Sequence, residues 1–183
     1  MPAGSPLFLC LMIKIMFVCH GNICRSPMAE IVFRDMVQRA GRDGEFEIAS
    51  SATSTEEIWN GVGNPVYPPA RAELKKHGLS AGDKRAVQLT KWDAEHYDAL
   101  IVMDDNNVRN ATRLVGPTDK LVKLMEFVGS TRDVSDPWYT GDFGGVYQDI
   151  VEGLDGLMAA LDGDARRATQ RAQAVAKKAR QNG

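Results

Sequence analysis

Short apolar runs alternate along the chain with stretches in which hydrophobic residues recur every three or four positions. The first run, IKIMFV at 13–18, predicts a buried strand. Residues 28–40 then show helical spacing, with Ser26 as the expected N-cap and Pro27 at the first helical position. Gly41 is a typical helix stop. This part of the chain therefore predicts a strand followed directly by a helix.

The same alternation continues to the C-terminal part of the chain. Strands are predicted at 46–52, 85–89 and 97–104, and a strand or buried segment at 120–128. Helices are predicted at 70–78, after a capping Thr90, at 106–116 and at 144–161. The last helix has one apolar face, formed by Val146, Ile150, Leu154, Leu157, Met158 and Leu161. Strands that alternate with helices predict an open parallel α/β sheet, and 183 residues suit one domain.

Charge is unevenly distributed. Residues 165–183 contain six Lys or Arg and no acidic residue, so the remainder carries 16 basic and 24 acidic side chains. Such a basic tail can bind nucleic acid or anionic lipid, but it is more typical of a solvated helix or a frayed end. We therefore expect no nucleic-acid partner and no membrane partner.

The cysteine content points to a reducing compartment. Cys10, Cys19 and Cys24 are too few, and odd in number, for a disulfide framework, which favours a cytoplasmic location. The segment before Met12 lacks a basic region and a clear cleavage site, so it is not a convincing signal peptide. No stretch is long enough to span a membrane.

The strand–helix junction at 19–26, CHGNICRS, has the properties of an oxyanion site. Ligands of open α/β sheets bind beyond the carboxyl ends of strands, where the amides and dipole of a helix N-terminus favour anions. Gly21 and Asn22 tolerate positive φ angles, and Arg25 can pair with two oxygens of a phosphate. These same groups favour the thiolate form of Cys19. The segment therefore predicts a nucleophile and an oxyanion receptor in one loop.

A phosphate ester also needs an acid to protonate its leaving group. The best candidate is Asp136 in SDPWYTGDF, where Pro137 stiffens the loop and Trp138 and Tyr139 can form the walls of a slot for a phenyl ring. An ordinary Asp-Pro turn explains this segment equally well. The sequence contains no nucleotide P-loop, and its three histidines are not spaced as a metal site, so we expect no metal and no cofactor.

Several motifs, in order, resemble the low-molecular-weight protein tyrosine phosphatases: VCHGNICRSPMAE, SATSTEEI, GNPVYPPAR, VMDDNN and DPWYTGDF. The resemblance covers residues 13 to about 162. It implies a Rossmann-like, single-domain open four-stranded parallel sheet flanked by helices, the phosphotyrosine phosphatase I type. It also implies a domain at 12–162, with an N-terminal extension at 1–11 and a basic C-terminal tail at 163–183. A monomer or weak homodimer is expected.

The resemblance also implies residue roles. Cys19 would be the nucleophile, Arg25 the phosphate and transition-state binder, and Asp136 the general acid and then the base. Phosphate binding would fall to the loop residues, and two further residues would support the loop from behind: His77 beside Asn22, and Asp104. Cys24 would be a redox partner that protects Cys19 in a reversible disulfide. The loop residues are His20, Gly21, Asn22, Ile23, Cys24, Arg25 and Ser26, with Ser26 supporting the thiolate.

Two positions depart from the family pattern. Glu56 stands where an aromatic residue usually borders the site, and Trp59 lies three residues later in a short insertion. His20 replaces the usual leucine or threonine after the nucleophile. We expect Glu56, Trp59, Trp138 and Tyr139 to form the substrate rim.

Three alternative functions compete with a tyrosine phosphatase. Protein-arginine phosphatases share the scaffold but resemble GNTCRS, whereas this chain has Ile23, which favours an aryl phosphate. Arsenate reductases need further resolving cysteines, and none follows Cys24. The third alternative is a catalytically idle phosphate-binding module. Cys19, Arg25 and Asp136 are all present, so nothing in the sequence argues for lost chemistry. The sequence therefore predicts a metal-independent phosphatase acting on phosphotyrosine and small aryl phosphates through a cysteinyl-phosphate.

Overall fold

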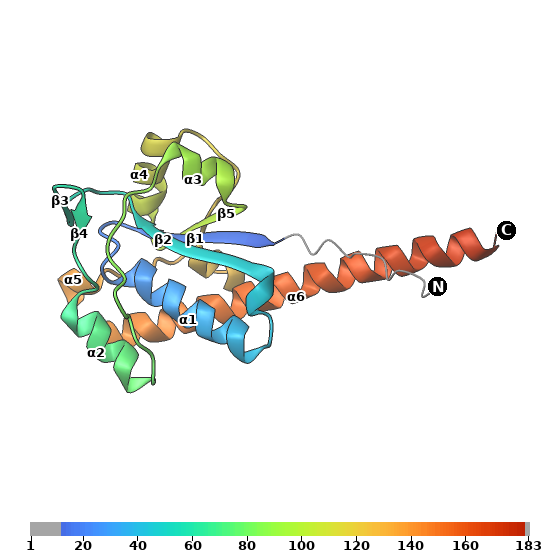
Figure 1. Cartoon of the computed structure of the whole chain (residues 1–183), viewed down its shortest axis with the longest axis horizontal. Coiled ribbons are helices and arrows are strands. Elements are labelled where there is room, and N and C mark those ends of the chain that lie inside the picture. Colours follow the sequence, from blue (N-terminus) through green and yellow to red (C-terminus); the bar gives the residue numbers. More distant parts are fainter. Residues whose placement is uncertain (1–11, 182–183) are drawn as a thin grey trace, which may run out of the picture.

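The computed structural model describes residues 12–181. Four parallel strands form the central sheet in the order β2-β1-β5-β6 (Figure 1). Their bounds are β1 Ile13–Cys19, β2 Phe46–Ala52, β5 Ala99–Val102 and β6 Leu121–Lys123. The predicted open parallel α/β sheet is confirmed.

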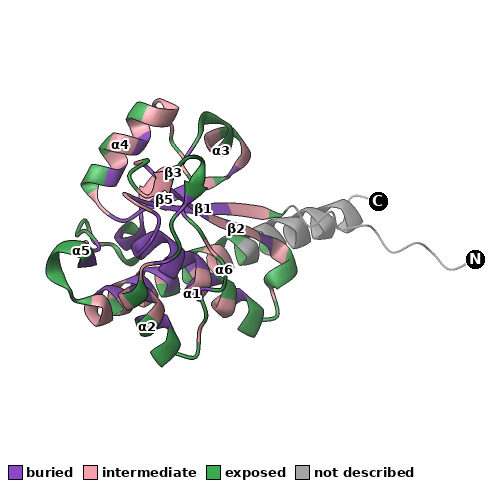
Figure 2. Cartoon of the chain, turned by 60° about the vertical axis from the view of Figure 1, so that its left-hand side comes forward, coloured by how far each residue is buried: buried purple, intermediate pink, exposed green. Residues whose placement is uncertain are grey.

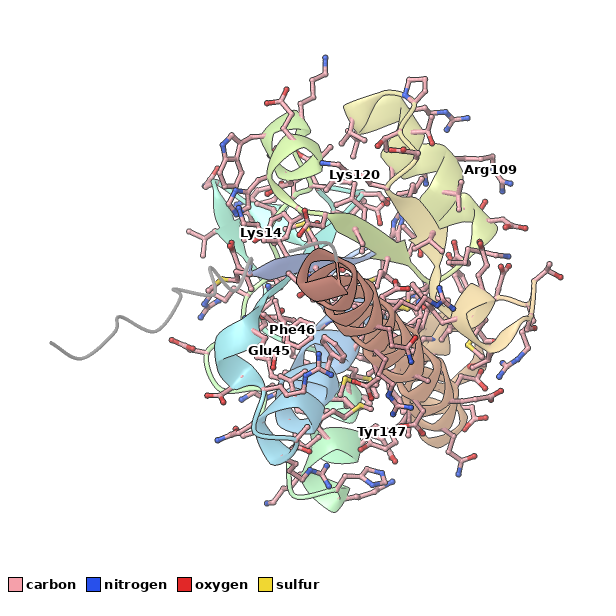
Figure 3. The ribbon with its side chains drawn as sticks, turned by 90° about the vertical axis from the view of Figure 1, so that its right-hand side faces the viewer. Lys14, Glu45, Phe46, Arg109, Lys120 and Tyr147 are labelled. Atoms are coloured by element: carbon pink, nitrogen blue, oxygen red, sulfur yellow. The ribbon has the colours of Figure 1, made fainter. Side chains whose placement is uncertain are left out.

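Helices cover both faces of this sheet. The α-helices are α1 Arg25–Arg39, α2 Pro68–Lys76, α3 Lys91–His96, α4 Asp105–Val115, α5 Pro137–Thr140 and α6 Phe143–Gln181. The 3₁₀ turns are η1 Asp43–Glu45 and η2 Leu124–Val128, and a hairpin pairs β3 Ile58–Trp59 with β4 Val62–Gly63. In Figure 3 the long helix α6 lies on the opposite side of the sheet from α4, which carries Arg109.

Strand β1 divides the core into two layers because alternate side chains of a strand point to opposite faces. Ile15 and Phe17 pack into the larger cluster, with α1, α2 and α6. Met16 and Val18 pack into the smaller one, with residues of β5 and α4. The continuous apolar run thus reflects a strand buried on both faces, and Figure 2 shows this buried centre.

The segment expected as a strand at 85–89 is not a full strand. It forms a single parallel bridge, between Ala52 and Gln88. Two backbone hydrogen bonds accompany it: Leu89 N donates to Ala52 O, and Ala52 N donates to Val87 O. The backbone N–H of Val87 donates instead to Asn22 Oδ1 (3.1 Å). The pairing with β2 ends here because the next backbone donor, Val87 N, is bound by a side chain of the 19–26 loop.

Helix α6 confirms the predicted apolar face and continues beyond it. Val146, Ile150, Leu154 and Leu157 are buried, and Leu161 packs against the same core. The helix then runs unbroken to Gln181, across the expected start of the tail at 163 (Figure 1). None of the helices between residues 12 and 181 is both apolar enough and long enough to traverse a bilayer.

Candidate active site

The loop between β1 and α1 lies at the carboxyl end of β1, where the connections to β2 and β5 leave in opposite directions. Such a switch point is the usual ligand site of an open α/β sheet. Helix α1 begins at Arg25, and the first amides of a helix have no partner within it. The sequence therefore places free donors and the positive end of a helix dipole next to Cys19.

The backbone of this loop is oriented by hydrogen bonds to its carbonyl oxygens. Thr53 N donates to Cys19 O (2.9 Å), Ser54 N to His20 O (2.9 Å), and Tyr67 N to Ile23 O (2.8 Å). In a trans peptide the N–H points away from the carbonyl oxygen of the same plane. Because neighbouring segments hold these carbonyls outward, the amides that follow them face the inside of the loop. This arrangement is a cradle for an oxyanion.

Asn22 fixes the shape of the loop. Its φ angle is 57°, in the left-handed region that asparagine tolerates better than most residues. Its side chain is fully buried: Nδ2 donates to Ser26 Oγ (2.8 Å) and to Ser50 Oγ (2.9 Å), and Oδ1 accepts from Val87 N. The predicted positive φ therefore occurs at Asn22, whereas Gly21 does not adopt one.

The Cys19 sulfur has two close polar neighbours. Ser26 Oγ lies 3.0 Å from Cys19 Sγ, and the backbone N–H of Asn22 donates to that sulfur at 3.3 Å. Ser26 was expected to cap α1, but the cap position is Cys24 and no side chain caps this end. The hydroxyl of Ser26 faces the loop instead, where hydrogen-bond donors stabilise a thiolate.

Arg25 is buried between two carboxylates. Its Nη1 donates to Asp104 Oδ2 (2.6 Å) and to the carbonyl of Val134 (2.9 Å), and its Nη2 donates to Asp136 Oδ2 (3.1 Å). Burial opposes the charge, but the Cys19 sulfur and the carboxylates of Asp136 and Asp104 outweigh it and raise the pKa of Arg25. The guanidinium is thus charged and fixed in one orientation.

Asp136 reaches the site from the segment that follows β6, an edge strand of the sheet. It follows β6 and η2 in the chain and occupies the N-cap position of α5, where its Oδ1 accepts from Trp138 N (3.1 Å). Its backbone is extended (φ −80°, ψ 113°), as expected for a residue before proline. One carboxylate oxygen therefore caps the helix while the other pairs with Arg25.

An open cavity lies over the loop. Glu56, Trp138 and Tyr139 line it as predicted, but Trp59 does not: this residue sits in β3 and is 79% exposed. Trp138 is held by the ring of Tyr67, with centroids 5.1 Å apart. The residues that line the cavity are Cys19, His20, Gly21, Ile23, Cys24, Arg25, Glu56, Glu57, Asp136, Trp138 and Tyr139.

Cys24 lines the same cavity as a free thiol, like Cys19. Burial, followed by the charges of Cys19 and Asp136, raises the pKa of Cys24 to about 12. At neutral pH this thiol is therefore protonated and is a poor nucleophile. The two cysteines of the loop are not equivalent.

His77 is not the partner of Asn22 that the resemblance implied. It follows α2, its Nε2 lies 3.1 Å from Glu73 Oε1, and its ring stacks on Tyr147 of α6 with centroids 3.7 Å apart. The physical reason is its place at the end of α2, against α6 rather than behind the loop. Asp104, in contrast, lies near the loop as the resemblance implied, and it accepts a hydrogen bond from Arg25.

Three residues that the sequence did not predict as part of the site support the loop from behind. Ser50 Oγ donates to Glu30 Oε2 (2.5 Å), and Lys84 Nζ donates to Ser50 O (3.1 Å) and lies 3.5 Å from Glu30 Oε2. A signal was available for Glu30, which is an acidic residue four positions after Ser26 on the inward face of a helix. Lys84 and Ser50 gave none because their approach to the loop depends on the fold.

Among residues 12–181, no cluster of three or more His, Cys, Asp or Glu side chains is arranged to hold a metal ion. The cationic groups that line the cavity are Arg25 and, when protonated, His20. An inward-facing amide cradle, a fixed guanidinium and a sulfur at its base define an oxyanion-binding α/β protein with a cysteine at the anion site.

Comparison with known proteins identifies the family. The model of the low molecular weight phosphotyrosine protein phosphatase family matches residues 14–168. The low molecular weight protein-tyrosine-phosphatase YfkJ of Bacillus subtilis (strain 168) is 35% identical over 154 residues, 82% of this chain and 96% of that protein. The corresponding phosphatase of Schizosaccharomyces pombe is 38% identical over 147 residues, 76% of this chain and 91% of the relative.

Solved structures agree with this result. The crystal structure of YfkJ superimposes with a TM-score of 0.78 at 34% identity, covering 84% of this chain and 96% of that one. A mutant of the YwlE arginine phosphatase with a phosphorylated active-site serine gives 0.72 at 26% identity, covering 84% and 99%. The chain belongs to the low molecular weight phosphotyrosine protein phosphatase family. It is therefore a protein tyrosine phosphatase, a hydrolase of phosphate esters.

Proposed function

We propose that Cys19, Arg25 and Asp136 carry out the hydrolysis of phosphotyrosine. The observation that carries this assignment is the single arrangement of Arg25, which pairs with Asp104 on one nitrogen and with Asp136 on the other. The nitrogen held by Asp104 and Val134 O is an anchor. The other nitrogen exchanges its Asp136 partner for a phosphate oxygen when substrate enters the cradle.

In the first step the Cys19 thiolate attacks phosphorus, so that a P–S bond forms and the P–O bond to the tyrosine breaks. Arg25 and the loop amides stabilise the charge on the equatorial oxygens, and Asp136, protonated for this step, gives its proton to the leaving phenolate. In the second step water attacks phosphorus, Asp136 takes a proton from it, and the P–S bond breaks. The products are the phenol, inorganic phosphate and the Cys19 thiolate.

The loop and its rim have separate proposed roles. His20, Gly21, Asn22, Ile23, Cys24, Arg25 and Ser26 surround the phosphate. Glu56, Trp138 and Tyr139 form the rim, and the tilted Tyr67–Trp138 pair supports a slot for the phenyl ring. Trp59 is left out of the rim because it does not line the cavity.

Cys24 is the proposed redox partner of Cys19. Peroxide would oxidise the Cys19 thiolate to a sulfenic acid, and the Cys24 thiol would then displace water to form a disulfide. Both residues line one cavity, which supports their pairing. A raised pKa keeps Cys24 as the resolving thiol and not as a second site of attack.

Phosphoprotein substrates follow from the family, and we infer the finer properties from the chain. A cytoplasmic location agrees with two free cysteines in the site. We propose a monomer or weak homodimer that binds neither nucleic acid nor membrane. Arginine phosphatase activity is the second candidate, since the YwlE structure is similar, but this chain has Ile23 where the arginine phosphatase motif GNTCRS has threonine, and Ile23 favours an aryl group.

The assignment is tested by hydrolysis of p-nitrophenyl phosphate in EDTA and DTT, with wild type beside Cys19→Ser. We expect metal-independent turnover in the wild type, no turnover in the variant, and retained phosphate binding in both. The serine hydroxyl is a far weaker nucleophile than a thiolate, whereas the amides and Arg25 are unchanged. A wild type that binds phosphate but never releases p-nitrophenol would instead be an idle phosphate-binding module.

A further inference from the structure

Two carboxylates line the mouth of the cavity and have no role in the proposed chemistry. Glu56 and Glu57 lie on the loop that follows β2. The Glu56 side chain is 72% exposed, and its Oε2 lies 2.9 Å from His20 Nε2. Glu57 Oε2 accepts from the neutral amide of Asn64 (2.7 Å). Neither carboxylate therefore pairs with a permanently charged cation among the described ion pairs of residues 12–181.

Glu57 is held close to the phosphate loop. A Cβ at Gly21 would lie 3.1 Å from Glu57 Cγ, so the absence of a side chain at Gly21 lets Glu57 pack directly over the loop. This is the physical use of glycine at a position without a positive φ. The negative charge of Glu57 thus lies at the edge of the anion cradle, where it weakens the attraction for a lone phosphate.

The positive charge of Arg25 does not offset these groups, because Asp104 and Asp136 already pair with it. A small phosphate ester therefore meets an acidic rim above the phosphate loop. A substrate that brings its own cation beside the phosphate satisfies both. Phosphotyrosine within a peptide does so when a lysine or arginine is its neighbour.

We propose that Glu56 and Glu57 select phosphotyrosine peptides with a lysine or arginine next to the phosphotyrosine. This inference rests on the proposed function and names its substrate class. Trp138, which also lines the cavity and packs on Tyr67, is the proposed contact of the phenyl ring, so different residues of the mouth would recognise different parts of the substrate. Glu56 and Glu57, after β2, recognise the flanking charge, and Trp138 of α5 recognises the aromatic ring.

The test compares kcat/KM for three phosphotyrosine peptides that differ only in the flanking residues, which are Lys, Gln or Glu. At low salt the wild type is expected to prefer the Lys peptide over the Glu peptide about tenfold, and 0.5 M NaCl should reduce that ratio. The Gln peptide should fall between them. No preference, or a preference for the Glu peptide, would overturn the proposal.

Variants assign the preference to the rim. Glu56→Gln with Glu57→Gln should reduce the Lys-to-Glu ratio to about twofold, and Glu56→Lys, at a position whose side chain is mostly exposed, should lower or invert it. The matched control is Glu95→Gln, an exposed residue of α3 that does not line the cavity, which should keep the wild-type ratio. A ratio unchanged in the rim variants would refute the assignment.

p-Nitrophenyl phosphate, which has no flanking residue, separates this inference from the proposed function. Turnover of this ester together with a peptide preference that follows rim charge supports both. Turnover with equal rates for all three peptides overturns the rim inference alone. Failure to turn over this ester or any of the peptides would overturn the proposed function, and the inference with it.

Discussion

Asp136 shows how one residue can be positioned for two proton transfers. Its Oδ1 caps α5 through Trp138 N, which fixes the rotation of the carboxyl group, and its Oδ2 points to Arg25 over the loop. The carboxyl group is part-buried, with 27% of the side chain exposed. It is therefore accessible to a leaving group and to water but cannot rotate freely.

Asp136→Asn should slow phenyl phosphate hydrolysis by about 10²- to 10⁴-fold, because phenolate is a poor leaving group without a proton donor. p-Nitrophenyl phosphate, whose leaving group is more stable as an anion, should be affected less. The measurement is kcat for both esters. Asp142→Asn is the control, since Asp142 caps Gly145 N and asparagine can do the same. Equal losses on the two esters would rule out Asp136 as the acid.

At this scale, short-range chemistry was predictable and long-range contacts were not. Cys19 and Arg25 lie in one segment whose spacing and strand–helix context could be read directly, and the place of Asp104 near the loop followed from the resemblance, although its contact with Arg25 did not. The partners of Asn22 were not found, because Ser50 and Val87 are distant in sequence and reach it only through β2 and the segment beside it. His77 was misplaced for the same reason.

At the scale of elements, two glycines allow α6 to pack closely on η2. A Cβ at Gly153 would lie 2.4 Å from Leu124 Cγ, and one at Gly156 would lie 2.6 Å from the carbonyl oxygen of Phe127. Glycine normally weakens a helix relative to alanine. Here close approach to the Leu124 side chain at Gly153 and to the Phe127 backbone at Gly156 explains the two glycines, and it brings η2 and the following segment, which leads to Asp136, against the helix.

Gly156→Ala should therefore destabilise the protein by about 1–3 kcal/mol, because the methyl group meets backbone that cannot move aside cheaply. Gly163→Ala is the matched control in the same helix: nothing lies within 4 Å of its Cβ position, so alanine should be neutral or stabilise by up to about 1 kcal/mol. Urea unfolding of both variants measures the difference. Similar values for the two would show that contact with η2 does not matter.

The elements themselves were largely readable from apolar spacing. The strand at 13–18 and the apolar face of α6 match the prediction, because burial on both faces or on one stripe leaves a clear pattern. The segment at 85–89 has a strand-like composition, but its pairing is limited by the hydrogen bond from Val87 N to Asn22. Composition cannot report that competition.

At the scale of the whole molecule, the walls of the cavity come from opposite edges of the sheet. Glu56 follows edge strand β2, Asp136 follows the other edge strand, β6, and the phosphate loop follows β1 between them. All three segments meet because parallel strands present their carboxyl ends at one side. Strand–helix alternation predicted the phosphate loop at the carboxyl end of a strand, whereas the places of Glu56 and Asp136 beside it were implied by the resemblance.

The extension of α6 offers a test of how much of the chain the fold requires. Leu161 packs against the core and Asp162 pairs with Arg42, so a chain ending at Asp164 keeps both contacts. We expect this truncated chain to retain kcat/KM for p-nitrophenyl phosphate within about twofold and to melt within about 2 °C of the full chain. A much lower melting temperature would show that residues 165–183 stabilise the body.

The direction of α6 has a practical consequence. The helix starts beside the cavity, where Phe143 lies near the ring of Tyr67 (6.0 Å between centroids), and its 39 residues correspond to about 58 Å of helix at 1.5 Å per residue. Its C-terminal end therefore points away from the mouth (Figure 1). A fluorophore, fusion partner or surface linker attached there would be held away from the cavity by the helix itself. Even a bulky phosphoprotein would then be free to approach the active site.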